Sequence, residues 1–444
     1  MKKHSGCGAI HALAVLALAI AVVFGETCAQ AATATATATA ITTATATAEP
    51  MPWPACIESL RRELPQYPTV RAETFDMQTR DVQDLRPVIR HATESQPEFK
   101  LAVWDYIARL VDTQRIADGQ TVLAAQAAPL RAIAARRGVD AATAVAVFGV
   151  ETDYGKVEGR YTVVDATLSR ACLDFGSKER KRHFFAALWL LQQGLVQPDA
   201  FRGSWAGAFG LTQFMPGTFV AYMDRGEGSG TIDIVRSAPD ALATTANFVA
   251  SSGWIGGLRW GIEVTRPSSA APTWVATERE HGCLGAGASN SAGKCRSVDQ
   301  WSALGVKPVA AAATAPTLAG DAQAALLAPA GPDGPAWLVT RNYQALWQYN
   351  RADSYALAIG LLSDALRGDP PMRAPWPTDD LGLGRAEMRD LQAELLRRGH
   401  DDVSVDGFDG PRTREAVRSE ERALGWAETG RAGARLLRTL QALK

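Results

Sequence analysis

Apolar residues recur at helical spacing along most of the chain from about residue 52 onward. The first such stretch runs from Cys56 to Gly119, with apolar positions at the period expected of helices that each bury one face. Further helices are predicted over residues 121–137, 182–194, 217–225, 238–252, 341–350 and 354–367.

Residues 141–150 form an apolar run with no polar face and are predicted to be a buried helix. Asp140 is a good N-cap for it, and Gly155 supplies a left-handed stop. Glu151 is the single acid at the end of this helix, where burial and the negative end of the helix dipole both raise the pKa of a carboxyl. A carboxyl that keeps its proton near neutrality can act as a general acid. The alternative is that Glu151 only satisfies neighbouring backbone or an arginine at the helix end.

The pattern changes between about residues 255 and 340. Short extended pieces, predicted over residues 260–265, 273–277 and 336–340, alternate with loops rich in Gly, Pro and Ala. This pattern predicts a small β-containing insertion in an otherwise helical domain, so the fold class is mainly α, or α+β.

A proline-rich stretch, residues 369–382, is predicted to be a stiff linker. It separates a large domain of residues 51–368 from a small domain of residues 383–444. A domain of about sixty residues is small, so we expect it to be tightly helical. Three apolar residues share one face of its first helix: Met388, Leu391 and Leu395.

The first 31 residues have the layout of a secretory signal, with Lys2 and Lys3 before an apolar run and a small-residue cleavage site that ends at Ala31. Residues 32–50 are rich in Ala and Thr and are predicted to be a disordered linker. The mature protein is therefore expected to be exported. No later stretch of the sequence is long and apolar enough to predict a bilayer span.

Charge argues against nucleic acid as a partner, and the cysteine content favours disulfides over a metal site. The chain has 46 Lys and Arg against 47 Asp and Glu, so its net charge does not point to nucleic acid as a partner. Removal of the leader would leave four cysteines in an oxidising compartment, which favours disulfides. Metal binding is the poorer alternative, because no CxxC pair occurs and the histidines are scattered. We expect Cys283 to pair with Cys295 across a Gly/Ser-rich loop, which leaves Cys56 to pair with Cys172.

Two further stretches carry candidate chemistry. Residues 204–216 are rich in glycine, which lets the backbone approach a bulky ligand, and Ser204, Gln213 and Phe214 could meet a sugar ring with a hydroxyl, an amide and an aromatic face. The alternative is a close helix packing contact. Tyr349 and Asn350 lie at a predicted helix end, where such a pair is typical of a cap or a buried hydrogen bond.

Several of these motifs occur in the order found in one enzyme family. Residues 149–155, 204–216, 237–247 with 253–254, and 349–350 with 354–358 together resemble the lytic murein transglycosylase B family. The similarity runs from about residue 52 to about residue 368. The resemblance implies a lysozyme-like helical catalytic domain. It also implies cleavage, without water, of the β-1,4 bond between N-acetylmuramic acid and N-acetylglucosamine in peptidoglycan, which leaves 1,6-anhydromuramic acid ends.

The resemblance also assigns roles to residues. Glu151 resembles the family's single catalytic acid, which protonates the leaving oxygen and then takes the proton of the C6 hydroxyl. This agrees with the presence of one carboxyl in the motifs, since an ordinary glycosidase needs two. Ser204 matches the serine that orients the N-acetyl group. The other matching positions, which line the groove or lie beside the acid, are Gln213, Phe214, Tyr349 and Asn350.

The chain departs from the family at two points in this domain. Arg180 and Lys181 fall near an arginine pair that faces the substrate in the family, and the alternative for this basic stretch is a solvated stripe. Relatives can carry a calcium loop where this chain has residues 224–233. Four oxygen ligands remain there, of which too few are charged to predict calcium. We therefore expect no metal and no cofactor. The four ligands are Asp224, Glu227, Ser229 and Asp233.

Residues 388–431 are similar to the three-helix peptidoglycan-binding domain, with Glu420 and Glu421 where an aromatic residue and a glutamine are common. These resemblances imply a periplasmic monomer whose partners are peptidoglycan glycan strands, with complexes of cell-wall synthesis as further candidates. The competing hypotheses are a lysozyme-type hydrolase and a catalytically silent peptidoglycan-binding protein.

Overall fold

The computed structural model describes residues 51–94, 96–267, 274–275, 284–285, 294–309 and 316–443. The predicted leader, the predicted Ala/Thr linker, Cys283 and most of the predicted strand 273–277 lie outside these residues.

The buried helix predicted from the apolar run is α8 (Ala141–Thr152), and its residues from Ala142 to Gly149 are all buried. The Asp140 carboxylate caps it by accepting from the backbone N–H of Thr143, as predicted. The stop differs from the prediction, because Asp153 is the left-handed C-cap, and Tyr154 and Gly155 follow it in left-handed conformations.

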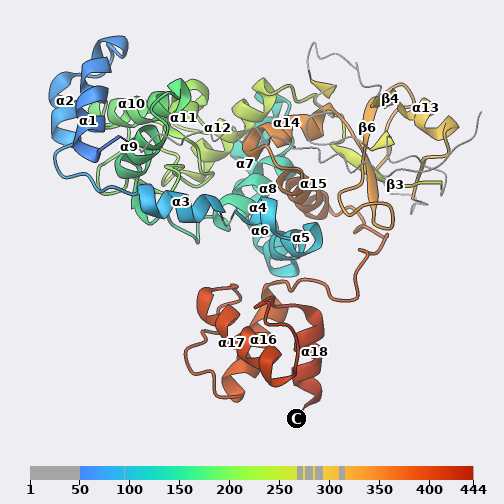
Figure 1. The fold of residues 1–444 in the computed structure, drawn as a ribbon. Coiled ribbons are helices and arrows are strands. Elements are labelled where there is room, and N and C mark those ends of the chain that lie inside the picture. Colours follow the sequence, from blue (N-terminus) through green and yellow to red (C-terminus); the bar gives the residue numbers. More distant parts are fainter. Residues whose placement is uncertain are drawn as a thin grey trace, which may run out of the picture. The chain divides into compact units, whose positions relative to one another are not determined.

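Helices surround α8 and make up most of the domain. α8 packs against α15 (Asp353–Arg367), and Figure 1 shows the two at its centre. The helix predicted over 121–137 is wrong as a single element, because the chain breaks at Gln126 between α6 and α7. The other helices before residue 369 are α1 (Trp53–Glu63), η1 (Leu64–Gln66), α2 (Ala72–Gln78), α3 (Arg86–Glu94), α4 (Pro97–Lys100), α5 (Val103–Leu110), α6 (Thr113–Ala125), α7 (Ala127–Arg137), α9 (Val163–Leu173), α10 (Lys178–Gln192), α11 (Pro216–Tyr222), α12 (Ala238–Ser251), α13 (Val298–Ala303) and α14 (Arg341–Asn350).

The predicted β-containing insertion is a five-stranded antiparallel sheet with the order β4-β6-β7-β3-β5. In β6, Ala325 and Leu327 pack on the central helical core, while Ala324 and Leu326 pack against a separate core under α13. Both faces of the strand are therefore buried. The strands are β3 (Gly261–Thr265), β4 (Cys295–Ser297), β5 (Lys307–Pro308), β6 (Gln323–Leu327) and β7 (Ala336–Val339).

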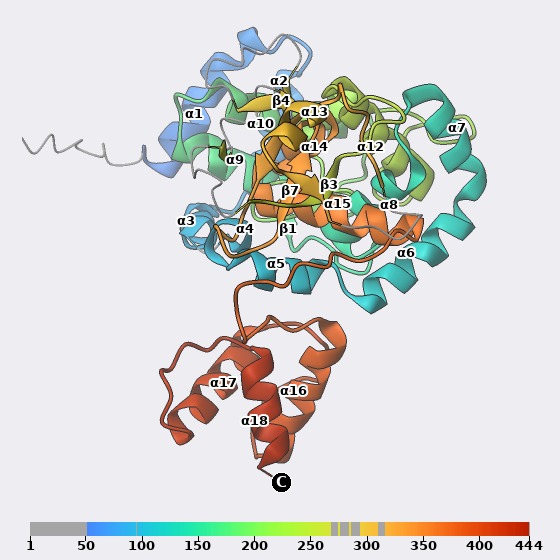
Figure 2. The same cartoon turned by 90° about the vertical axis from the view of Figure 1, so that its right-hand side faces the viewer.

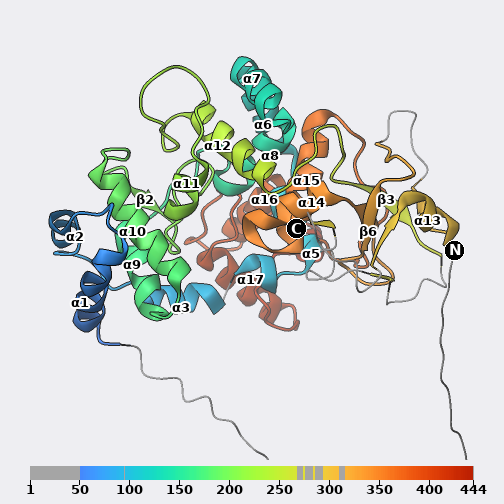
Figure 3. The ribbon, with the colours of Figure 1, turned by 90° about the horizontal axis from the view of Figure 1, so that it is seen from above.

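A second helical core lies around α9 and α10, which pack on each other. The disulfide between Cys56 and Cys172 joins α1 to α9 in this region, which confirms the predicted pair. A two-stranded ribbon of β1 (Tyr161–Thr162) and β2 (Arg202–Gly203) leads from this core toward α8. Figures 1 and 3 both show α9 and α10 at one end of the large domain and the sheet at the other, with α8, α14 and α15 between.

The C-terminal residues form a bundle with its own core, as Figure 2 shows. Its helices are α16 (Arg385–Arg397), α17 (Pro411–Ala423) and α18 (Ala434–Ala442), which confirms the predicted three-helix fold. Leu391, Leu395, Val417 and Leu440 are fully buried within it. Among the described helices, none has the length and apolar character that a bilayer crossing requires.

Candidate active site

Glu151 lies in the last turn of α8, and Oε1 of its carboxyl accepts a hydrogen bond from the hydroxyl of Tyr355 on α15. Burial is the largest cause that raises the pKa of Glu151 to about 8. The Tyr355 hydrogen bond opposes that change, and the nearby Glu98 carboxylate adds to it. The sequence predicted the direction of this pKa shift and the burial that causes it. At neutral pH most of the Glu151 carboxyl therefore holds its proton.

Three tyrosines surround this carboxyl. Tyr355 and Tyr349 stack with ring centroids 6.1 Å apart, and the Tyr349 hydroxyl donates to the backbone oxygen of Thr212 (2.7 Å). Burial raises the pKa values of Tyr106, Tyr349 and Tyr355, and the Glu151 charge raises them further, so all three stay neutral. The sequence did not single out Tyr355, because its place on an apolar helix face is equally typical of a core tyrosine.

The end of α8 holds a strained conformation just beyond Glu151. Asp153 (φ 50°) and Tyr154 (φ 60°) are consecutive left-handed residues, each of which costs about 1–2 kcal/mol relative to a right-handed one. The Tyr154 ring fills a slot against Gly119 and Gly149, where an added Cβ would overlap it. The Tyr154 hydroxyl also donates to the backbone oxygen of Arg115 (2.9 Å). Contacts from outside α8 therefore fix the turn that follows the acid.

The glycine-rich stretch 204–215 is a series of turns and bridges rather than a helix. A close packing contact is nevertheless present, because an added Cβ at Gly207 would overlap Thr167 of α9. Ser204 Oγ accepts from the backbone N–H groups of Ala206 and Ala208 (both 3.2 Å). Gln213 adopts a left-handed conformation (φ 51°), and its side-chain amide donates to the backbone oxygen of Gly210 (2.9 Å). These contacts fix the local conformation of the stretch.

A cavity of about 800 Å³ brings several predicted site residues together. Phe214 is nearly fully buried in its wall and meets the Tyr349 ring edge-on, with centroids 5.4 Å apart. Gln213 also lines a second cavity of about 300 Å³ with Thr152 and Arg202, so it lies between the two. The polar and aromatic lining of the larger cavity includes Glu179, Arg182, Gln213, Phe214, Tyr349 and Asn350.

The basic residues at the start of α10 lie in different environments. Lys181 is buried, where its ammonium donates to the Glu63 carboxylate (2.7 Å) and lies 4.2 Å from the Phe175 ring centroid. It is therefore not part of a solvated stripe. Arg180 faces Asp174 (3.7 Å), whereas the next residue, Arg182, lines the larger cavity. Sequence spacing did not distinguish these neighbouring side chains.

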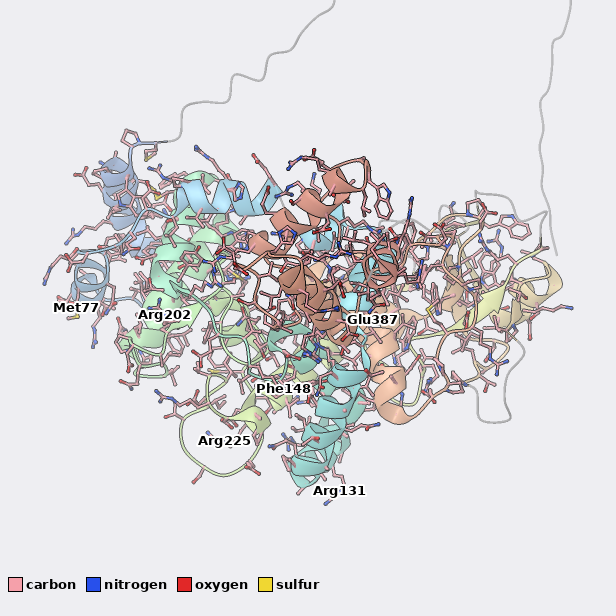
Figure 4. The ribbon with its side chains drawn as sticks, turned by 90° about the horizontal axis from the view of Figure 1, so that it is seen from below. Met77, Arg131, Phe148, Arg202, Arg225 and Glu387 are labelled. Atoms are coloured by element: carbon pink, nitrogen blue, oxygen red, sulfur yellow. A yellow bond between two sulfur atoms is a disulfide. The ribbon has the colours of Figure 1, made fainter. Side chains whose placement is uncertain are left out.

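The loop 224–233 does not fit a calcium site. The Asp224 carboxylate accepts from Nε of Arg137 (3.0 Å), so a cation of the chain already occupies it. Both oxygens of Asp240 accept backbone N–H groups of the loop, and Asp233 Oδ1 accepts the backbone N–H groups of Val235 and Arg236 just after it. Figure 4 shows Arg225 on this outlying loop and Phe148 of α8 among the central helices. Within the described residues, no cluster of three His, Cys, Asp or Glu side chains could hold a metal ion.

In the C-terminal bundle, Glu420 and Glu421, which stand where an aromatic residue and a glutamine are common, both have hydrogen-bond partners. Glu421 accepts from the hydroxyl of Thr429 (2.5 Å) and the backbone N–H of Gly430 (2.7 Å), which fixes the loop before α18. Glu420 bonds to the His400 ring (2.8 Å). A cavity of about 710 Å³ on this bundle is lined by residues that include His400, Asp402, Arg412 and Glu415.

Comparison with known proteins identifies two family matches along the chain. Residues 53–364 match the family described as transglycosylase SLT domain, and residues 384–440 match the putative peptidoglycan binding domain. The membrane-bound lytic murein transglycosylase B of Escherichia coli (strain K12) is 28% identical over 234 residues, which are 52% of this chain and 57% of that protein. The chain therefore matches little more than half of that relative's length.

Solved structures show the same architecture. SltB3 from Pseudomonas aeruginosa, solved in complex with NAG-NAM-pentapeptide, is 35% identical with a TM-score of 0.63, and the match covers 88% of this chain and 100% of that one. Slt35 of Escherichia coli, solved in complex with calcium, is 20% identical with a TM-score of 0.56, and the match covers 70% of this chain and 92% of that one. The second likeness supports the fold alone.

Proposed function

This chain belongs to the transglycosylase SLT domain family, and from that premise we propose that it is a lytic transglycosylase of peptidoglycan. The proposed reaction cleaves the β-1,4 bond between N-acetylmuramic acid and N-acetylglucosamine and leaves a 1,6-anhydromuramic acid end. The observation that carries the proposal is Glu151, a carboxyl that keeps its proton near neutral pH. Its hydrogen-bond partner Tyr355 stacks on Tyr349, and Tyr349 lines the cavity of about 800 Å³.

The reaction balances with one carboxyl. Glu151 gives its proton to the glycosidic oxygen, the bond from that oxygen to C1 of muramic acid breaks, and N-acetylglucosamine leaves as the alcohol. The resulting carboxylate takes the proton of the C6 hydroxyl as O6 bonds to C1, so Glu151 ends protonated and no water is consumed. The muramoyl N-acetyl oxygen stabilises the cation that develops at C1.

The neighbouring residues have positioning roles in this proposal. Tyr355 holds the Glu151 carboxyl in one orientation through its hydroxyl. In its hydrogen bonds to described residues the Ser204 hydroxyl acts as an acceptor, so its proton can be donated to the N-acetyl oxygen. Gln213, Tyr349 and Asn350 would contact sugar hydroxyls where they line the cavity, and Phe214 supports the Tyr349 ring from beneath.

The structure also identifies the residue that would distinguish a lysozyme-type hydrolase from the proposed transglycosylase. A lysozyme-type hydrolase needs a second carboxylate at a defined separation from the acid. The candidate is Glu98 on α4, because its negative charge raises the pKa of Glu151. Under the proposed reaction Glu98→Gln retains turnover, whereas a hydrolase that used Glu98 would lose it.

The test is digestion of purified peptidoglycan, with mass spectrometry of the released muropeptides. We expect 1,6-anhydromuramic acid ends, which are lighter than reducing ends by one water, from the wild type and from Glu98→Gln. Reducing ends would establish hydrolysis instead. If the protein binds peptidoglycan but releases no fragment, it is a wall-binding protein and the proposed activity is wrong.

The proposed setting follows from the same features. The Cys56–Cys172 disulfide is typical of an oxidising compartment, which agrees with the predicted export to the periplasm. We propose that the C-terminal bundle binds the wall and that glycan strands are the partner of the large domain. Fractionation of cells that express the full chain would test the location.

A further inference from the structure

Arg385, the first residue of α16, lies buried between two carboxylates of the large domain. Its Nη1 donates to Oδ2 of Asp153 (2.6 Å), and its Nε donates to Oδ2 of Asp112 (3.0 Å). Asp112 is itself the N-cap of α6, so its other oxygen accepts the backbone N–H of Arg115. One side chain of the C-terminal bundle therefore bridges the start of α6 and the end of α8.

Two other arginine pairs hold the bundle against the same domain. Nε of Arg431 donates to Oδ2 of Asp105 (2.7 Å), and Arg109 of α5 donates to Asp409 (2.5 Å). The backbone of the connecting segment also comes close, since a Cβ at Gly382 would lie 2.8 Å from the Cα of Asp105. The bundle is thus docked on the large domain by contacts from several elements, despite the proline-rich segment that connects them.

The Arg385 contact differs from the other two because it reaches the end of the helix that carries Glu151. Asp153, the left-handed cap of α8, follows Glu151 by two residues. Arg115 approaches its Oδ1 at 3.4 Å, and Arg385 approaches its Oδ2 at 2.6 Å, so Arg385 makes the closer contact. Without Arg385, Asp153 would keep only the longer contacts to Arg115 (3.4 Å) and Lys156 (4.0 Å), and Asp112 would lose its bidentate guanidinium partner.

We propose that Arg385 is a positioning residue for Glu151, so that the C-terminal bundle supports the active site as well as binding the wall. Arg385 neutralises Asp153 and holds the left-handed turn that sets where the last turn of α8 presents the acid. The inference rests on the proposed function, in which Glu151 is the acid.

The test compares Arg385→Met with Arg431→Met in the full chain. The substrate is a soluble muropeptide oligomer, so that capture of whole wall by the bundle does not limit the rate. Small displacements of a catalytic group cost about 10-fold to 100-fold in rate, and we expect a fall of that size in kcat for Arg385→Met with little change in KM. Arg431→Met removes a docking contact that does not reach α8 and should keep the wild-type kcat.

Two further measurements separate positioning from simple destabilisation. Arg385→Lys keeps the charge but cannot bridge both carboxylates, so it should restore part of kcat. Hydrogen exchange over residues 150–157 should rise in Arg385→Met and not in Arg431→Met, a readout that does not depend on activity. If Arg385→Met does not fold, Asp153→Asn removes the Arg385–Asp153 ion pair together with the longer Arg115–Asp153 pair, with little change of shape. It should show at least the same fall in kcat.

Wild-type kcat in a folded Arg385→Met or Asp153→Asn protein would overturn the inference, whatever the loss of thermal stability. Equal losses of kcat in Arg385→Met and Arg431→Met would also overturn it, because docking in general would then be the cause. The proposed function fails by a different result, namely a wild-type digest without anhydro ends.

Discussion

Replacement of Tyr355 by phenylalanine removes the hydroxyl that donates to Glu151 and leaves the ring in place. This hydrogen bond favours the ionised carboxylate, so its loss raises the pKa of Glu151 above its present value of about 8. A hydrogen bond contributes about 1.5 to 3 kcal/mol when its acceptor is charged and about 0.5 to 1.5 kcal/mol when both partners are neutral. The difference of about 1 to 1.5 kcal/mol corresponds to an expected pKa rise of roughly one unit.

The consequence is visible in the pH dependence of kcat/KM, which reports on the free enzyme. The acid must be protonated to act, so the wild-type rate should fall on the alkaline side with a midpoint near 8. In Tyr355→Phe this midpoint should move upward, while the plateau drops because the carboxyl loses its fixed orientation. Tyr106 and Tyr349 stay neutral throughout, since burial raises their pKa values too.

The assay is the initial rate of release of soluble fragments from muropeptide oligomers over roughly pH 5 to pH 10, a range that spans the expected midpoints. Tyr343→Phe is the matched control, because its hydroxyl is bonded to Asp353 rather than to Glu151. The control should unfold more easily but keep the wild-type midpoint. A midpoint in Tyr355→Phe that stays in place or moves downward would refute the assignment of Glu151 as the titrating acid.

Three further predictions concern single contacts. Glu151→Gln should lose at least about 10³-fold in turnover. The folded pKa of Glu151 lies above its ordinary value of 4.5, so between pH 4.5 and pH 8 the carboxyl ionises in the unfolded chain and stays protonated in the folded one. The wild type therefore loses stability as the pH rises, and Glu151→Gln should melt higher than wild type at pH 8 and equally at pH 4. Loss of the Cys56–Cys172 disulfide in a double alanine variant should lower the free energy of unfolding by about 4 to 5 kcal/mol by loop entropy, measured by denaturant titration. A chelator should leave the melting temperature of the wild type unchanged, whereas Arg137→Ala, which removes the closer of the two arginines at Asp224, should lower it. A fall of the melting temperature with chelator would contradict the conclusion that the loop does not bind calcium.

Local chemistry in the sequence predicted the helix of the acid well. The Asp140 cap and the unbroken apolar run are short-range signals, and both are present in α8. Gly155 is left-handed as predicted, but the helix already ends at Asp153, because contacts from distant segments impose the left-handed conformation on Asp153 and Tyr154. Such contacts leave no periodic pattern in the sequence.

The sheet shows a second limit of prediction from the sequence. Strand β6 carries apolar residues on both faces, because one face packs on the helical core and the other on the core under α13. Alternation of polar and apolar residues predicts a strand only when one face meets water. Tyr355 was missed for a related reason, since a buried catalytic neighbour and a core residue have the same spacing on a helix.

The Arg137–Asp224 pair affects how the stability of the loop depends on the composition of the medium. A calcium ion is a ligand, and its contribution to stability grows with its chemical potential in the medium. A guanidinium that is part of the chain is not lost on dilution, so its contribution to stability does not depend on the calcium concentration. The conformation of this loop is therefore held by side chains of the protein at every calcium concentration.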